Sequence, residues 1–434
     1  MNETPALDAD AIVIGGGPAG STAATTLARA GHRVILLERD VFPRDHVGEA
    51  LTPSTNNVLR DIGVLAKVEE AGFFHKAGVG WTAPRSPLWK LLSVRTSDYP
   101  PPDAVQPYSY NVERADFDAI LLRHAKEQGV QVLQGVTARE VLLEGGRAVG
   151  VRASVTDGWE RPLRSRVVID ASGRRCMLAN QLGLRRKDRE FNQFAVFSWF
   201  ESLAPSPAGF EDFLMLHFLG LRRAWAWQIP MRHGRVSVGV VTEKADFQTS
   251  GVGAEEFFAS MVARNRTLAH VMADAEAVRP YEVEGDYSYD MTTVSGDGWL
   301  LVGDALRFVD PIFSSGVDVA LYSGVFAAEA VRQAWTDGDE RASFGSYGRR
   351  VSDGVDVWYR MTQLFYDLQL LFTWFMVTRA YRRDLVRVLQ GNPYMPETQA
   401  VARTLIEEMT ATREQISATE GSLLRPAALS KGAS

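Results

Sequence analysis

A glycine-rich turn near the N-terminus has the residue types and spacing of a phosphate-binding site. Gly15, Gly17 and Gly20 follow a short apolar run, and Glu38 stands further along the chain. The first glycine permits a tight turn, the second lets a pyrophosphate approach the backbone, and the third allows close contact between a helix and a strand. The N-terminus of the following helix favours phosphate through its free N–H groups. Glu38 is placed to accept hydrogen bonds from a ribose, so this segment predicts a dinucleotide site.

Three strand-to-turn segments from distant parts of the chain are expected to form this site. Residues 11–14 predict a buried strand, an alanine-rich helix ends near Gly31, and residues 33–38 predict a second strand, which together make a βαβ unit. Two further apolar strands run into turns at residues 167–173 and 299–305. The sequence contains no second GxGxxG motif for a nicotinamide nucleotide.

The rest of the chain predicts a second lobe and a helical C-terminal region. Residues 141–151 indicate a hairpin on a Gly-Gly turn, and residues from about 190 to 280 alternate as in an antiparallel sheet. A long helical pattern runs from near Gly316 to about Trp335, and the chain from Gly354 onward is mainly helical. The Ser/Ala/Gly-rich tail from Gly421 is expected to be mobile. Residues 358–377 are apolar but interrupted by polar residues, which favours a buried or pocket-lining helix over a membrane span.

Composition excludes several classes of protein. The 434 residues are 46% hydrophobic and 23% charged, which is typical of a globular chain of two or three domains. Forty-seven basic against 53 acidic side chains leave a formal charge of -6, which argues against nucleic-acid binding. The single cysteine, Cys176, excludes an intramolecular disulfide, and the seven histidines lack metal-ligand spacing, so we expect no metal. This cysteine usage and the absence of a secretory signal predict a cytoplasmic protein.

Several motifs together resemble a known family. Asp170–Gly173, Gly303-Asp304-Ala305 and Asp310-Pro311, with the glycine turn, resemble the FAD-binding pattern of the flavoprotein hydroxylase fold. Residues 114–118 are similar to the RxxFD element of that fold, whose arginine lies near the flavin. Residues 225–230, Trp-Ala-Trp-Gln-Ile-Pro, match the WxWxIP signature of flavin-dependent halogenases, and residues 74–78 resemble the segment that carries their essential lysine. The resemblance covers roughly residues 8 to 390 and is greatest to halogenases that act on pyrroles or phenols.

The resemblance implies an α/β fold of the p-hydroxybenzoate hydroxylase type. Its Rossmann-like FAD-binding domain would be assembled from residues 8–75, 110–180 and 290–350. Residues 76–109 and 181–289 would form an antiparallel-sheet substrate lobe, residues 351–420 a helical C-terminal region, and residues 421–434 a flexible tail.

The resemblance also implies a cofactor site and a reaction. Reduced FAD, O2 and chloride or bromide would together yield hypohalous acid at the flavin. The halide is expected at Ser315 and Gly316, because N–H groups at a helix start favour an anion. Asp304 is suited to accept from the ribityl hydroxyls. The residues expected to bind FAD are Gly15, Gly17, Ala19, Gly20, Glu38, Arg39, Arg114, Gly303, Asp304, Gly316 and Val317.

Lys76 is the expected halogen donor, either by hydrogen bonding hypochlorous acid or as a transient chloramine. Its apolar sequence neighbours predict burial, which lowers a lysine pKa, although an arbitrary lysine is usually a solvated surface charge. On a strand, Trp225, Trp227 and Ile229 share one face, and with Pro230 and Pro311 we interpret them as structural. Tryptophan halogenases carry a glutamate where this chain has Phe313. The acceptor ring is therefore expected to be electron-rich by itself, a phenol or pyrrole, and not free tryptophan.

Two patterns in the C-terminal region leave alternatives open. Leu364, Phe365, Leu368, Leu371, Phe372 and Phe375 share a helical stripe that either fills the core or lines an aromatic pocket. Arg379, Arg382, Arg383 and Arg387 share one helix face, which is either solvated or docks an acidic carrier protein and its phosphopantetheine.

The expected function is that of an FADH2-dependent halogenase. A separate flavin reductase would supply the reduced cofactor, and the aromatic substrate would be free or tethered to a carrier protein. One alternative is an aromatic monooxygenase, which would oxidise NAD(P)H itself and insert oxygen. The other is a catalytically silent FAD-binding protein.

Overall fold

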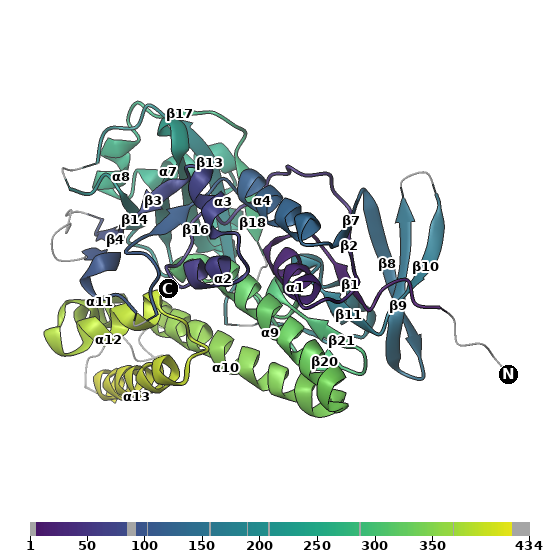
Figure 1. Cartoon of the computed structure of the whole chain (residues 1–434). Helices are drawn as coiled ribbons and strands as arrows, with labels where there is room; N and C mark the ends of the chain where they lie inside the picture. The colour runs from purple at the N-terminus through teal and green to yellow at the C-terminus, as the bar shows by residue number, and fades with distance from the viewer. Residues whose placement is uncertain are drawn as a thin grey trace.

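Two large sheets and a helical C-terminal region dominate the described part of the chain (Figure 1). The computed structural model describes residues 6–84, 93–101, 103–155, 158–188, 190–206, 209–285, 288–367 and 369–418. The tail from Gly421 lies outside the described residues.

The first sheet has six strands in the order β20-β21-β11-β1-β2-β7. Its strands are β1 (Ala11–Ile14), β2 (Val34–Glu38), β7 (Gln131–Gln134), β11 (Val167–Asp170), β20 (Ser295–Gly296) and β21 (Trp299–Leu301). They are parallel except at the β20–β21 pair. Every residue of β1, β2, β11 and β21 is buried, which explains why these strands are continuous apolar runs. Helix α1 (Pro18–Arg29) packs against α4 (Arg114–Glu127) and α9 (Gly316–Asp337).

The second sheet runs in the order β17-β13-β16-β15-β14-β4-β5, and β18 also pairs with β13. Its strands are β4 (Gly78–Thr82), β5 (Ser93–Arg95), β13 (Gln193–Glu201), β14 (Phe213–Phe218), β15 (Trp225–Pro230), β16 (Val236–Glu243), β17 (Glu276–Ala277) and β18 (Glu282–Gly285). The predicted antiparallel pairing is confirmed, except that β14 and β4 are parallel. Helices α6 (Lys244–Ser250), α7 (Ala254–Val262) and α8 (Arg266–Val271) interrupt the strand-rich region, which the alternation did not predict.

Side chains alternate between the two faces of this sheet. Trp225, Trp227 and Ile229 belong to one buried cluster, and Ala226 belongs to another cluster that includes Phe257 of α7. The first cluster is completed by the C-terminal helices α10 (Glu340–Asp367), α11 (Gln369–Val377), α12 (Arg379–Gln390) and α13 (Pro396–Ala418). The C-terminal helices therefore cover the Trp225 face of the sheet, while α7 packs on the opposite face (Figure 1).

Short elements connect these parts. They are α2 (Thr55–Asp61), α3 (Leu65–Glu70), α5 (Met177–Gln181), the β3–β6 pair (Phe74–Lys76, Ser109–Asn111) and the β12–β19 pair (Arg185–Lys187, Tyr289–Met291). A three-stranded sheet contains β8 (Val136–Glu144), β9 (Arg147–Val155) and β10 (Glu160–Arg164), with the predicted Gly145-Gly146 turn between β8 and β9. Among the helices of the described ranges, none is long and apolar enough to cross a membrane.

Candidate active site

The turns after β1, β11 and β21 converge, as the sequence predicts, and glycine makes the convergence possible. Gly15 has φ +104°, and a Cβ there would lie 2.3 Å from the Ala171 carbonyl oxygen. A Cβ at Gly20 would lie 1.9 Å from the Gly15 carbonyl oxygen, and one at Gly303 would lie 2.9 Å from the Cβ of Ala19. A side chain at Gly15 or Gly303 would push neighbouring turns apart, and one at Gly20 would push α1 away from the glycine turn.

Glu38, the last residue of β2, holds the glycine turn in place by hydrogen bonding. Its Oε2 accepts a hydrogen bond from the Gly16 N–H at 2.7 Å, and its Oε1 accepts one from the Asp40 N–H at 2.8 Å. The side chain is buried, and each carboxylate oxygen retains a further acceptor position. By contrast, Arg39 is exposed and pairs with Asp40 at 3.4 Å.

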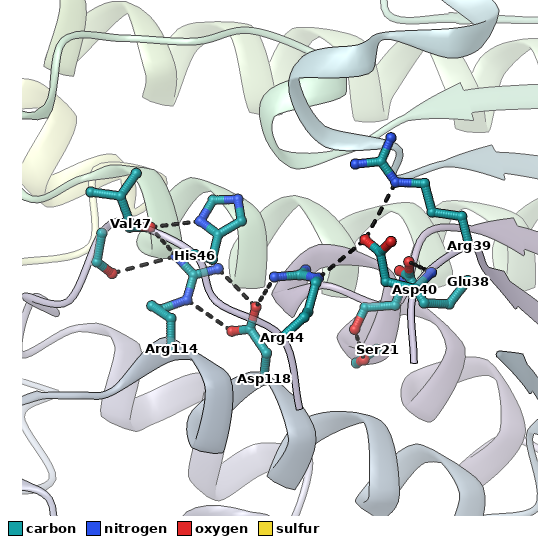
Figure 2. Close-up of polar contacts among 11 residues, drawn as sticks. Ser21, Glu38, Arg39, Asp40, Arg44, His46, Val47, Arg114 and Asp118 are labelled. Atoms are coloured by element: carbon teal, nitrogen blue, oxygen red, sulfur yellow. Dashed lines mark hydrogen bonds and ion pairs between the residues drawn. The ribbon is translucent and has the colours of Figure 1, made fainter. Parts of the chain in front are cut away.

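An arginine–aspartate bridge borders this turn (Figure 2). Arg44 lies between Asp40, 4.0 Å away, and the buried Asp118, 3.3 Å away. Arg114 binds the same Asp118 through Nε at 2.8 Å and Nη2 at 3.0 Å, and its Nη1 donates to the Val47 carbonyl at 2.9 Å. Arg114 therefore fixes the segment that follows Arg44. Asp118 is the aspartate of the RxxFD element, and the i,i+4 spacing of Arg114 and Asp118 is typical of such an ion pair, whereas Arg44 was not identified from the sequence.

Asp304 fits a ligand that carries hydroxyl groups. It follows β21 and is half-buried, and its carboxylate accepts no hydrogen bond from the residues that the structure describes. Burial raises its pKa to about 6, and the nearby Arg114 and Arg174 oppose that rise. A carboxylate with open acceptor positions beside a glycine turn suits the ribityl chain of a flavin, so the residues present fit FAD.

Lys76 is buried at the end of β3, beside an apolar cavity. Its Nζ donates a hydrogen bond to the Leu51 carbonyl, which also accepts from Ser109 Oγ at 2.9 Å. Burial lowers the Lys76 pKa to about 7. The cavity has a volume of about 80 Å³. It is lined by Thr52, Pro53, Lys76, Gly78, Val79, Trp81, Val94, Thr96, Leu214, Leu216, Ile312, Phe313, Ser314, Met376, Val386, Leu389 and Gln390.

The turn before α9 reaches the same cavity. Residues 311–313 form a short 3-10 turn, and Ser314 then adopts φ +56°, in the left-handed region. Ser315 is the buried N-cap of α9, whereas Gly316 faces open space, because a Cβ there would meet nothing within 4 Å. The first amide groups of a helix have no partner within the helix, so this turn presents N–H groups to an anion. Val317 follows it into the core.

Buried polar groups tie β15 to its surroundings, and of these Tyr366, Ser237 and Glu49 were not identified from the sequence. The Trp225 indole N–H donates to the Tyr366 hydroxyl at 2.7 Å, and that hydroxyl donates to Asp310 at 3.0 Å. The Trp227 indole N–H donates to Ser237 Oγ at 3.1 Å. Ser237 in turn bonds the buried Glu49 carboxylate at 3.2 Å. Pro230 ends the strand and accepts from Asn111.

The described residues of the apolar C-terminal stripe are buried in the core, whereas most of the arginine face is exposed. Leu364, Phe365, Phe372 and Phe375 are buried in the core beside β15, and none of these four lines the cavity, which favours core packing. The side chains of Leu368 and Leu371 lie outside the described part of the chain. Arg379, Arg383 and Arg387 are exposed, whereas the half-buried Arg382 donates to the Met376 and Ser93 carbonyls.

Comparisons with known proteins agree with this geometry. A family model described as an FAD binding domain matches residues 8–341. A 1H-pyrrole-2-carbonyl peptidyl-carrier-protein chlorinase from Pseudomonas fluorescens is 39% identical over 430 residues, covering 95% of this chain and 94% of the chlorinase. The corresponding brominase from Pseudoalteromonas luteoviolacea is 29% identical, covering 88% of this chain and 91% of the brominase.

A solved structure of similar architecture is that of the flavin-dependent brominase Bmp2. It superposes with a TM-score of 0.83 at 28% identity, covering 93% of this chain and 99% of the brominase. The fold class expected from the sequence is thereby confirmed, whereas the domain boundaries stay a prediction. With a family model spanning most of its length and a 39% identical relative along nearly all of it, the chain belongs to the flavin-dependent halogenases.

Proposed function

We propose that this halogenase delivers halogen through Lys76 to an electron-rich ring held in the adjoining cavity. The observation that carries the proposal is that the buried Lys76 amine and the turn before α9 border one cavity. When bound in its reduced form, FAD supplies, with O2 and chloride or bromide, the hypohalous acid. Because burial brings the Lys76 pKa to about 7, the ammonium and the neutral amine are both present near neutral pH.

Each form of Lys76 offers one route. The ammonium donates a hydrogen bond to hypochlorous acid and orients its chlorine toward the ring. The neutral amine instead exchanges a hydrogen for chlorine and releases water, and the ring then takes the chlorine and returns its own hydrogen to the amine. The apolar walls limit access of bulk water, which would hydrolyse the N–Cl bond back to the amine and hypochlorous acid.

In this proposal the cofactor and halide are held by the convergent turns. FAD contacts Gly15, Gly17, Ala19, Gly20, Glu38, Arg39, Arg114, Gly303, Asp304, Gly316 and Val317. The amides of Ser315 and Gly316 bind the halide, because they begin α9 and favour negative charge. A separate flavin reductase supplies FADH2.

The cavity supports a small ring as substrate. Its volume of about 80 Å³ is below the roughly 150 Å³ of a cavity that holds benzene, so a single small ring fits it better than a bicyclic indole. Phe313 lines the wall and stacks on Phe372 with ring centroids 5.6 Å apart, so it brings no charge to stabilise a cationic intermediate. These features and the carrier-bound substrate of the Pseudomonas relative support a pyrrole or small phenol.

A basic stripe supports a carrier-bound form of the substrate. Arg382 of α12 donates to the Ser93 carbonyl, and the next residue, Val94, lines the cavity. Val386, one turn further along α12, also lines the cavity. The exposed Arg379 and Arg383 lie along this side of the helix, where they can bind the phosphate of a phosphopantetheine arm.

The proposed chemistry is tested in one assay. The protein is supplied with FAD, a flavin reductase, NADH and halide, and pyrrolyl, phenolic and tryptophan substrates, free and carrier-linked, are followed by mass spectrometry. We expect a gain of halogen on a pyrrole or phenol, and its loss in Lys76→Ala with FAD binding intact. A gain of oxygen would support a monooxygenase, no change a silent flavoprotein, and turnover of tryptophan alone would refute the ring assignment. An active Lys76→Ala would refute the role of the lysine.

The carrier proposal is tested by charge reversal. Arg379→Glu with Arg383→Glu is expected to raise KM for a carrier-bound substrate and leave turnover of the free acid unchanged. The matched control reverses two exposed cations of α4, Arg123→Glu with Lys126→Glu. Equal KM values for the carrier-bound substrate in both double variants would refute docking at α12.

A further inference from the structure

We infer that Tyr366 of α10 is a positioning residue that holds the turn of residues 310–315 against β15, so that this wall of the active-site cavity keeps its shape. The inference rests on the proposed function, because it assigns this turn to the reaction site. It brings the C-terminal helices into the catalytic machinery, beyond their role of covering the sheet.

The hydroxyl of Tyr366 joins two elements that are distant in the sequence. It accepts from Trp225 Nε1 of β15 at 2.7 Å and donates to Asp310 Oδ1 at 3.0 Å. Asp310 Oδ1 also accepts from the Ile312 N–H at 3.1 Å. Asp310, Trp225 and Tyr366 are 0%, 2% and 5% exposed, so water does not compete for these hydrogen bonds.

The turn needs an external anchor because its own backbone is strained. Ser314 has φ +56°, a backbone conformation that residues other than glycine rarely adopt. Such a conformation persists only where the surrounding structure enforces it. Within the turn, Ser314 N–H bonds the Pro311 carbonyl and Ile312 N–H bonds Asp310. Asp310 therefore holds the start of the turn, and Tyr366 holds Asp310.

Loss of the Tyr366 hydroxyl would change the geometry of the reaction site. Oδ2 of Asp310 is buried and has no hydrogen-bond partner among the described residues, so Oδ1 carries the polar contacts of this carboxyl group. Removing one of its two donors leaves a buried group undersatisfied and the turn free to shift. Ile312, Phe313 and Ser314 line the cavity with Lys76, and Ser315 follows directly.

The hydroxyl is distinguishable from simple packing. The neighbouring Phe365 fills the same buried cluster without a hydroxyl, so the core here accepts a bare aromatic ring. The link also accounts for tryptophan at position 225, since a phenylalanine there could not donate to Tyr366.

Tyr366→Phe tests this inference, and Tyr347→Phe is the matched control. Tyr347 is buried on the same helix, and its hydroxyl bonds the Leu301 carbonyl at 2.5 Å. For Tyr366→Phe we expect unchanged FAD affinity, about a fivefold higher KM for chloride, and more hydrogen peroxide per halogenated product, as follows from loss of the buried hydrogen bond that anchors Asp310. Tyr347→Phe should lower thermal stability comparably while leaving the chloride KM and the peroxide ratio unchanged.

A double-mutant cycle makes the test sharper. Trp225→Phe removes the Trp225–Tyr366 hydrogen bond, which Tyr366→Phe also removes. The double variant should therefore show a chloride KM no higher than that of the single variant with the higher KM. Additive effects, or equal changes in Tyr366→Phe and Tyr347→Phe, would overturn the inference while the enzyme still halogenates. If the unsubstituted enzyme forms no halogenated product, the proposed function fails and the inference falls with it.

Discussion

Replacing Lys76 by methionine should stabilise the protein, by an amount that depends on pH. The ordinary lysine pKa of 10.5 falls to about 7 in the folded protein because the amine is buried. At about 1.4 kcal/mol for each pH unit, this difference corresponds to up to about 5 kcal/mol of folding free energy. Methionine has a similar length, is apolar and carries no proton.

The sign of the effect follows from proton binding. Between pH 7 and 10.5 the unfolded lysine carries a proton that the folded one has lost, so stability of the unsubstituted protein rises with pH. Lys76→Met lacks this dependence. Its stability advantage should therefore be largest at or below pH 7 and shrink by about 1.4 kcal/mol for each pH unit up to pH 10.

Urea unfolding of the FAD-free protein at several pH values between 7 and 10 measures the difference. Groups other than Lys76 titrate alike in both proteins and cancel. Lys126→Met, at an exposed position of α4, is the control and should show no such slope. A constant difference between Lys76→Met and the unsubstituted protein would show that Lys76 keeps an ordinary pKa. It would refute the reasoning that burial prepares this amine for halogen transfer near neutral pH.

Two further predictions concern the cofactor site. Gly20→Ala should lower both stability and FAD affinity, because its Cβ would lie 1.9 Å from the Gly15 carbonyl oxygen. Gly17→Ala should lower FAD affinity alone, because the nearest atom to its Cβ would be 3.6 Å away. Thermal melts measure stability and flavin fluorescence titrations measure affinity, and equal stability losses in the two variants would contradict the assignment. FAD affinity should also fall as pH drops below about 6, because the Asp304 carboxyl then takes up a proton and loses an acceptor. Asp304→Asn should bind FAD weakly and without this pH dependence. If the variant kept the same pH dependence, the titrating group would be a residue other than Asp304.

Much of the site was predictable because its requirements are local. The glycine turn depends on backbone geometry within a few residues, and the alternation of Trp225, Trp227 and Ile229 follows from the period of a strand. Lys76 was identified by resemblance, and its burial was expected from its apolar neighbours. The helices α6–α8 and the parallel β14–β4 pairing were not predicted, because short helices and strand partners depend on tertiary packing.

The amino-acid sequence by itself determined the α/β class, the convergence of the three turns and, by resemblance, the family, and it predicts the role of Lys76. Only the tertiary structure decided which polar groups support them. Tyr366 and Asp310 are 56 positions apart, and Tyr366 and Trp225 are 141 apart, so no periodicity relates them. The cavity likewise combines residues from β3, the second sheet, the turn before α9 and α12. The physical reason is that backbone conformational preferences depend on a few neighbouring residues, whereas burial is a property of the assembled core. Burial lowers the Lys76 pKa and strengthens each hydrogen bond in the core.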